Sequence, residues 1–381
     1  MFPERTFSKF SFTAASICSK EIKYIQQRDN DMHEKVKDYY GQILTGSADL
    51  KTSACCDSGA MPGAIKKIIG DLDDEIIRKF YGCGSPIPPV LEGCTVLDLG
   101  CGTGRDVYIV SKLVGEQGNS IGIDMTDGQL HVAKRHIDSQ MKRFGYKRTN
   151  VAFKQGHIED LHSAGIIDNS IDVVISNCVL NLSPDKSSVF KEIFRVLKPG
   201  GELYFSDVFA DRRIPERLKE DSVLLGECLA GALYMEDFRR LLAEQGCLDY
   251  RVVEIGKIEI KNADIEKKIG MVSFDSRTIR AFKLDDLEDI CEDYGEVAIY
   301  KGTIPEHPHS FELDEHHEFI TGKPVLVCGN TASMLQNTRY AKHWTVMGNK
   351  TVHYGPFDCT SNCTSNSVTV SAAQDINSCC Q

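Results

Sequence analysis

Four cysteines lie in sequence contexts that suit the chemistry of soft ions. Cys55 ends the run Leu-Lys-Thr-Ser-Ala-Cys, Cys83 lies in Tyr-Gly-Cys-Gly, Cys178 in Ser-Asn-Cys-Val and Cys228 in Gly-Glu-Cys-Leu. Thiolate is the soft ligand among protein side chains, so sulfurs that converge in the fold favour soft ions over magnesium or calcium. These four residues are therefore the first candidates for chemistry.

The remaining cysteines have a simpler interpretation. The 15 cysteines are an odd number in a chain of 381 residues, which lacks the small size and regular spacing of a secreted disulfide framework. We expect buried small hydrophobic side chains at Cys94, Cys247, Cys291 and Cys328, and only a space requirement at Cys101. Cys56 is an alternative to Cys55. A tail that captures zinc or arsenic is one interpretation of Cys359, Cys363, Cys379 and Cys380. Because no zinc-finger ligand set is completed nearby, we expect these thiols to be exposed and reactive.

A glycine-rich turn between a strand and a helix indicates a nucleotide-like ligand. Residues 96–104 read Val-Leu-Asp-Leu-Gly-Cys-Gly-Thr-Gly. Glycine lets the backbone pass close to a ligand, and a helix N-terminus supplies N–H donors. Asp124 ends the next strand, about 20 residues later, where a carboxylate binds ribose hydroxyls. The turn is one residue tighter than the G-x-G-x-x-G of nicotinamide enzymes, and an ordinary tight turn remains the alternative.

Alternating strands and helices position this turn and predict a largely parallel sheet with helices on both faces. The expected strands are 95–99, 120–125, 151–154, 172–176 and 202–207. The expected helices are 73–80, 105–114, 127–144 with Thr126 as N-cap, 215–229 and 235–245. Short alternating runs at 251–260 and 296–300 predict a smaller α+β unit.

The composition divides the chain into four segments. We expect a disordered lead over 1–30, an α/β domain with the glycine turn and the cysteines over 31–250, an α+β domain over 251–345, and a disordered tail over 346–381. The net charge of −11 argues against nucleic acid and anionic membranes as partners. No apolar stretch approaches the roughly 20 residues of a membrane span. The cysteines within the α/β pattern favour reduced thiols in a cytosolic enzyme, and we expect a cytoplasmic monomer.

The glycine turn, with its leading Leu-Asp-Leu-Gly, resembles the first motif of class I S-adenosylmethionine-dependent methyltransferases. The resemblance implies a Rossmann-like fold in which Asp98 lies near the amino-acid end of the cofactor, Asp124 binds the ribose and Met125 packs on the adenine. Residues 156–159 and 176–179 resemble the adenine-edge motif and the loop that faces the methyl group. The implied cofactor-binding residues are Tyr81, Gly82, Asp98, Gly100, Gly102, Thr103, Gly104, Asp106, Asp124, Met125, His157, Ile158, Glu159 and Asn177.

The contexts of the four cysteines, with Phe80-Tyr-Gly-Cys-Gly and residues 201–207, closely resemble the arsenite methyltransferases over about residues 50–343. The resemblance implies stepwise methylation of thiol-bound As(III) to mono-, di- and trimethylated arsenicals. Cys178 and Cys228 would anchor arsenic with Cys83 as third ligand. Cys55 and Cys83 would act in relay or as a disulfide that restores trivalent arsenic, with thioredoxin or glutathione as reductant.

The chemistry of the metalloid agrees with such a site. As(III) prefers sulfur to carboxylate or imidazole, and three thiolates leave its lone pair available to attack a methyl group. That nucleophile carries no proton, so no general base is needed, unlike many oxygen and nitrogen methylations. Two alternatives stay open: a class I methyltransferase for an organic small molecule, and a thiol-based metalloid-binding protein without catalysis.

Overall fold

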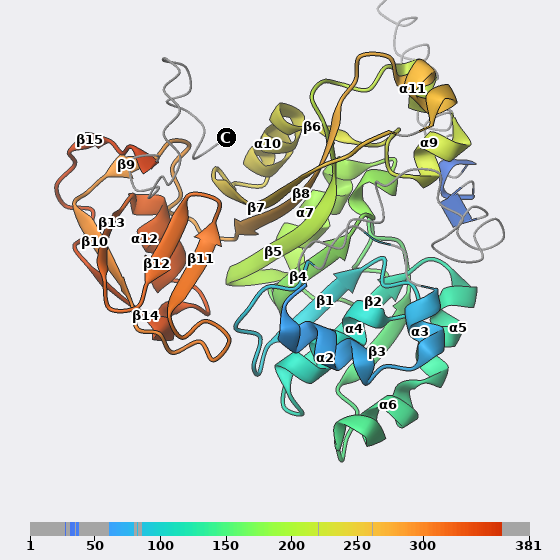
Figure 1. Cartoon of the computed structure of the whole chain (residues 1–381), viewed down its shortest axis with the longest axis horizontal. Helices are drawn as coiled ribbons and strands as arrows, with labels where there is room; N and C mark the ends of the chain where they lie inside the picture. Colours follow the sequence, from blue (N-terminus) through green and yellow to red (C-terminus); the bar gives the residue numbers. More distant parts are fainter. Residues whose placement is uncertain are drawn as a thin grey trace, which may run out of the picture.

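The chain forms a large helix-covered sheet joined to a smaller unit of short sheets (Figure 1). The computed structural model describes residues 27, 31–34, 36–37, 61–79, 82, 86–219, 221–260 and 262–359. Within that part of the chain, no helix is both long enough and apolar enough to cross a membrane.

The large sheet has eight strands, in the order β3-β2-β1-β4-β5-β8-β7, with β6 paired to β5. The first five run parallel, whereas β8 is antiparallel to both β5 and β7. Their bounds are β1 (Thr95–Leu99), β2 (Asn119–Asp124), β3 (Val151–Gln155), β4 (Ile171–Asn177), β5 (Leu197–Ala210), β6 (Leu233–Tyr234), β7 (Tyr250–Lys257) and β8 (Phe274–Phe282). This confirms the mostly parallel, Rossmann-like sheet.

Both faces of the sheet are covered, because alternate side chains of its central strands point to opposite sides. Val96 and Val173 pack with one set of helices, whereas Leu97 and Val174 pack with the other. The first set comprises α2 (Gly63–Gly70), α3 (Asp74–Arg78), α4 (Arg105–Val114), α5 (Asp127–Arg135) and α6 (Ile137–Phe144). The second comprises α7 (Lys186–Val196) and α10 (Met235–Glu244).

Three short helices and a 3₁₀ turn lie near the carboxyl end of β4 and β5. They are η3 (Leu180–Leu182), α8 (Glu216–Lys219), α9 (Ser222–Gly226) and α11 (Ala263–Ile269). Leu182, Leu218, Leu224 and Ile265 join one buried apolar cluster that also contains Cys178. This cluster closes the end of the sheet where ligands of α/β proteins bind.

The C-terminal unit surrounds α12 (Gly329–Gln336) and shares the core of the large sheet, since Tyr300, Phe311 and Trp344 belong to the same apolar cluster as Leu97. Its sheets are β13-β10-β14, β11-β12 and β15-β9 (Figure 1). The bounds are β9 (Glu292–Asp293), β10 (Glu296–Tyr300), β11 (Ser310–Asp314), β12 (His317–Ile320), β13 (Pro324–Val327), η4 (Ala341–His343), β14 (Trp344–Met347) and β15 (Gly355–Pro356).

The predicted boundaries differ from the structure in three places. The helix expected over 127–144 divides at His136, which hydrogen-bonds Glu75 at 3.0 Å, and the helix expected over 215–229 is the separate pair α8 and α9. The boundary after residue 250 cuts the large sheet, because β7 and β8 pair with β5 and with each other. The tail expected from 346 begins inside β14, and β15 continues the ordered chain beyond it.

Candidate functional site

The glycine turn after β1 takes a backbone path that side chains would obstruct. Gly100 and Gly104 have φ angles of +72° and +85°. A Cβ at Gly100 would lie 2.4 Å from Cγ2 of Val179, and one at Gly104 would lie 2.6 Å from Cζ of Phe153. Gly104 is also the N-cap of α4. Glycine is therefore required here both by the conformation and by the close packing.

Asp124 holds the turn from the end of β2. Its Oδ2 accepts a hydrogen bond from the backbone N–H of Gly102 at 2.9 Å, and its Oδ1 accepts one from the N–H of Thr126 at 2.8 Å. Burial raises the pKa of Asp124, although these two hydrogen bonds oppose the rise. The carboxylate therefore has a structural task in addition to any contact with a ligand.

One cavity at the carboxyl ends of β1, β2 and β4 collects most of the predicted ligand-binding residues. It contains about 1050 Å³ of empty space, part of which is open to solvent. Its walls include Asp98, Gly100, Gly102, Thr103, Asp106, Asp124, Met125, His157, Ile158, Glu159, Asn177 and Cys178. Gly104 starts the helix behind the wall, and Gly82 is buried outside it. The position agrees with the rule that α/β sheets bind ligands at their carboxyl edge.

Three carboxyl groups give one end of this cavity a strongly acidic character. Asp98 and Asp106 are each 4% exposed, and Asp124 lines the same wall. Burial, together with the neighbouring Asp106 and Asp124, raises the pKa of Asp98 well above its ordinary value. The Arg105 guanidinium pairs with Asp106 at 2.7 Å and offsets part of this negative charge, and a positively charged small molecule would relieve the rest.

Glu159 lies at the other side of the cavity in a hydrogen-bonded setting that the sequence did not reveal. Its Oε1 accepts from Ser183 Oγ at 2.5 Å and lies 3.1 Å from His33 Nε2. Burial opposes ionisation of Glu159, but the hydrogen bonds from His33 and Ser183 outweigh it and lower the pKa. Other wall residues absent from the prediction are Val36, Lys79, Thr126, Gln129 and Leu182.

Cys178 and Cys228 meet beside the cavity, although 50 residues separate them in sequence. Cys178 follows β4 and lines the cavity, and Cys228 follows α9 and is fully buried. The Cys228 thiol donates to the Cys178 carbonyl at 3.1 Å. The two sulfurs and a carboxylate oxygen of Asp207 all lie within 4.8 Å of one another. Cys178 is disulfide-bonded, and the other described cysteines are thiols.

The same two cysteines share an unusual backbone conformation. Their φ angles are +55° at Cys178 and +62° at Cys228, and among the described non-glycine residues only Val90 and Asn169 also have positive φ. A side chain in the left-handed region costs about 1–3 kcal/mol, and such residues gather at functional sites where the surrounding structure fixes them. The strain supports a functional role for this pair of residues.

Asp207 is a member of this group that sequence reasoning missed. It is 1% exposed and accepts hydrogen bonds from Asn181 Nδ2 at 2.7 Å and from the Val208 N–H at 2.8 Å. Burial raises its pKa to about 7 and lowers that of nearby Lys186 to about 8. Its place on β5, next to the strand that ends at Cys178, was the available signal.

Comparisons with known proteins agree with this geometry. Residues 91–246 match a family model described as a methyltransferase domain, and residues 294–378 match one described as the arsenite methyltransferase C-terminal domain. An arsenite methyltransferase of Aquipseudomonas alcaligenes is 51% identical over 327 residues, which are 86% of this chain and 94% of that protein. The chain belongs to the arsenite methyltransferase family.

Other members of the family support the assignment. The human arsenite methyltransferase is 42% identical over 84% of this chain and 84% of its own length. The crystal structure of CrArsM, an arsenic (III) S-adenosylmethionine methyltransferase from Chlamydomonas reinhardtii, matches with a TM-score of 0.76 and 51% identity. The match covers 78% of this chain and 100% of the CrArsM chain.

Several predicted site residues of this arsenite methyltransferase family member lie outside the described part of the chain. These are Cys55, with its neighbour Cys56, Tyr81 and Cys83. The tail thiols Cys363, Cys379 and Cys380 also lie outside it. The expectation that Cys359 is exposed is wrong, because it is 2% exposed and packs with Cys291 and Cys328.

Proposed function

We propose that the chain transfers methyl groups from S-adenosylmethionine to trivalent arsenic bound by cysteine sulfur. The observation that carries the proposal is the meeting of Cys178 and Cys228 at the wall of the acidic, glycine-lined cavity. The family supports the substrate, since its members are named for arsenite.

The cavity fits S-adenosylmethionine by its shape and charge. Asp98, Asp106 and Asp124 suit the ammonium and sulfonium charges of this molecule, and the backbone at Gly100 and Gly102 allows close approach. When bound, S-adenosylmethionine supplies an electrophilic methyl group on sulfur. Met125, His157 and Ile158 form the wall that would hold the adenine.

Cys178 and Cys228 would hold arsenic through two As–S bonds, with Cys83 as third ligand. Because Cys178 lines the cavity, arsenic bound there faces the cofactor, and proximity supplies much of the rate enhancement. Trivalent arsenic attacks through a lone pair and loses no proton. The methyl transfer therefore needs no proton acceptor from the cavity wall. Asp207, buried beside both sulfurs, would accept a proton when the reduced thiols ionise to bind arsenic.

The disulfide at Cys178 must be reduced before arsenic binds there. We assign that reduction to thioredoxin or glutathione, and we assign to Cys55 and Cys83 the relay that returns the methylated product to the trivalent state. Methylation would continue stepwise to mono-, di- and trimethylated arsenicals. A reducing cytoplasm suits this cycle, and we expect a monomer there.

The test is product speciation after incubation of the reduced protein with labelled S-adenosylmethionine, arsenite and glutathione. Cys178→Ser and Cys228→Ser should each lose arsenite methylation and retain cofactor binding in equilibrium dialysis. Cys94→Ser is the matched control, since Cys94 is buried away from the cavity. Turnover by either site variant would refute the thiolate site, and methylation of an organic acceptor alone would favour the first alternative. Arsenic binding without methylated products would favour the second.

A further inference from the structure

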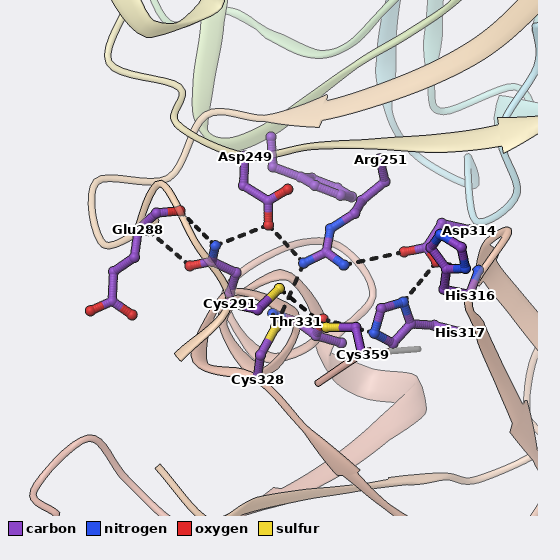
Figure 2. Close-up of polar contacts among 12 residues, drawn as sticks. Asp249, Arg251, Glu288, Cys291, Asp314, His316, His317, Cys328, Thr331 and Cys359 are labelled. Atoms are coloured by element: carbon purple, nitrogen blue, oxygen red, sulfur yellow. Dashed lines mark hydrogen bonds and ion pairs between the residues drawn. The ribbon is translucent and has the colours of Figure 1, made fainter. Parts of the chain in front are cut away.

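Three more thiols meet inside the C-terminal unit, away from the methyl-transfer cavity. Cys291, Cys328 and Cys359 are 7%, 0% and 2% exposed, and their sulfurs all lie within 4.8 Å of one another (Figure 2). The sulfurs of Cys359 and Cys291 are 3.1 Å apart, and all three residues are thiols. Three thiols brought together in a buried position make a ligand set for a soft ion.

Secondary structure builds this cluster from three separate segments. Cys291 precedes β9 and Cys359 follows β15, and the Phe357 N–H donates to the Cys291 carbonyl at 2.8 Å beside their ladder. Cys328 is the N-cap of α12, where its sulfur accepts from the Thr331 N–H at 3.4 Å. The ladder and the helix therefore fix all three sulfurs before any ion binds.

Charged groups on one side of the cluster limit which ion it can hold. Arg251 Nη2 lies 3.7 Å from Cys328 Sγ, and the guanidinium also pairs with Asp249 at 2.7 Å and Asp314 at 3.6 Å (Figure 2). One buried cation already shared by two buried carboxylates compensates little further negative charge. A trivalent ion with three thiolates is neutral, whereas a divalent ion would leave a buried negative charge.

The spacing of the sulfurs points in the same direction. Zinc–sulfur bonds of about 2.3 Å in a tetrahedron place the sulfurs roughly 3.8 Å apart. The Cys291 and Cys359 sulfurs are closer than that, at 3.1 Å. Among the described residues, the metal-ligand group here consists of three cysteines without a fourth ligand. A three-coordinate ion suits this set better than tetrahedral zinc.

We propose that Cys291, Cys328 and Cys359 form a second arsenic site, which binds As(III) as a tris-thiolate. Arsenous acid, As(OH)₃, reacts with three thiols to give As(S-Cys)₃ and three waters. Three As–O and three S–H bonds break, three As–S and three O–H bonds form, and arsenic stays trivalent. None of the three cysteines lines the cofactor cavity, so arsenic held here is not methylated.

Binding at this site would tie the β9–β15 ladder to α12 and stabilise the C-terminal unit. The ladder has only two residues in each strand, so its opening gives arsenous acid access to the thiols. A ligand that binds the folded state alone raises the free energy of unfolding, and the rise grows with the logarithm of the ligand concentration relative to Kd. The single tryptophan of the chain, Trp344, lies in β14 of the same unit and reports its unfolding.

The experiment uses the full chain, reduced with a phosphine and freed of reductant, and titrated with arsenite alone. We expect arsenite to protect Cys291, Cys328 and Cys359 together from alkylation, as mapped by mass spectrometry, and to raise the thermal midpoint of Trp344 fluorescence. Cys359→Ser should lower the bound arsenic by one equivalent and abolish the protection of Cys291 and Cys328. Cys247→Ser is the control, because Cys247 is equally buried and lies outside the cluster.

Arsenic binding is measured here independently of turnover, so the result is distinct from failure of the proposed function. Cys359→Ser should retain methylation, which shows that the variant folds, and Cys359→Ala provides a second variant. Unchanged arsenic stoichiometry in both variants would overturn the proposal. It would also be overturned by tighter protection of these thiols by zinc chloride than by arsenite, or by a Cys291–Cys359 disulfide that persists in the phosphine-reduced protein.

Discussion

Replacing Gly100 by alanine should distort the glycine turn at the point where it passes the loop after β4. The φ angle of +72° costs an alanine about 1–2 kcal/mol. Its Cβ would also meet both γ-carbons of Val179, at 2.4 and 2.5 Å, and overpacking of this kind costs about 1–3 kcal/mol. We therefore expect Gly100→Ala to lower the free energy of unfolding by about 2–5 kcal/mol.

Gly102→Ala is the matched control for this change. Gly102 also has a positive φ, of +52°, but nothing lies within 4 Å of a Cβ built there. Gly102→Ala should therefore lower the free energy of unfolding only by the cost of the positive φ angle, about 1–2 kcal/mol. In a Val179→Ala background both γ-carbons are gone and only the Val179 Cβ, 2.9 Å away, remains, so Gly100→Ala should cost less there than in the wild-type background.

Urea unfolding of the wild type, the two glycine variants, Val179→Ala and the Gly100→Ala/Val179→Ala double variant, followed by circular dichroism and by Trp344 fluorescence, measures these differences. Coincident transitions by the two probes justify a single free energy for each protein. Binding of S-adenosylmethionine to Gly100→Ala should weaken in parallel, since Gly100 and Val179 both line the cavity. Equal losses in Gly100→Ala and Gly102→Ala would refute the role of the Val179 contact.

Two further predictions concern buried carboxylates of the site. The pKa of Asp207, raised by burial to about 7, means that its contribution to stability is fully present below pH 4 and is lost as the pH rises through 7. The difference in unfolding free energy between wild type and Asp207→Asn should therefore fall by about 2–3 kcal/mol from pH 5 to pH 8, and a constant difference would contradict it. Asp124→Asn replaces one of the oxygens that accept from the Gly102 and Thr126 N–H groups by an N–H donor. Calorimetry should therefore show the affinity for the cofactor reduced by about tenfold or more. Unchanged affinity would refute the role of Asp124.

The parallel half of the sheet was predictable because its strands are short apolar runs between helices, and glycines or helix-capping residues mark where those helices begin and end. Thr126 does mark the start of α5, and Asp73 caps α3. The strands β7 and β8 were harder, since an alternating pattern shows that one face is buried but not which sheet the strand joins. Their placement depends on long-range pairing with β5, which local sequence does not encode.

The acids that line the cavity were predictable for a similar reason. Asp98 and Asp124 lie at set numbers of residues along the sequence from the glycine turn, and the carboxyl ends of their parallel strands meet at one edge of the sheet. By contrast, His33 reaches Glu159 across 126 residues of sequence, and Asp207 reaches the cysteines through the packing of β5 beside β4. Residues recruited by tertiary packing carry no local motif, so only the structure identifies them.

The two thiol clusters offer arsenic similar ligands, and their surroundings decide whether bound arsenic can be methylated. Cys178 lies on the wall of a cavity whose three carboxyl groups attract a cationic methyl donor. Cys328 lies at the N-terminal end of α12, 3.7 Å from the guanidinium of Arg251, and does not line that cavity. Because methyl transfer needs the donor within contact of the arsenic lone pair, sulfur coordination alone does not make a catalytic centre. On the two proposals made above, the first cluster turns arsenic over, whereas the second retains it.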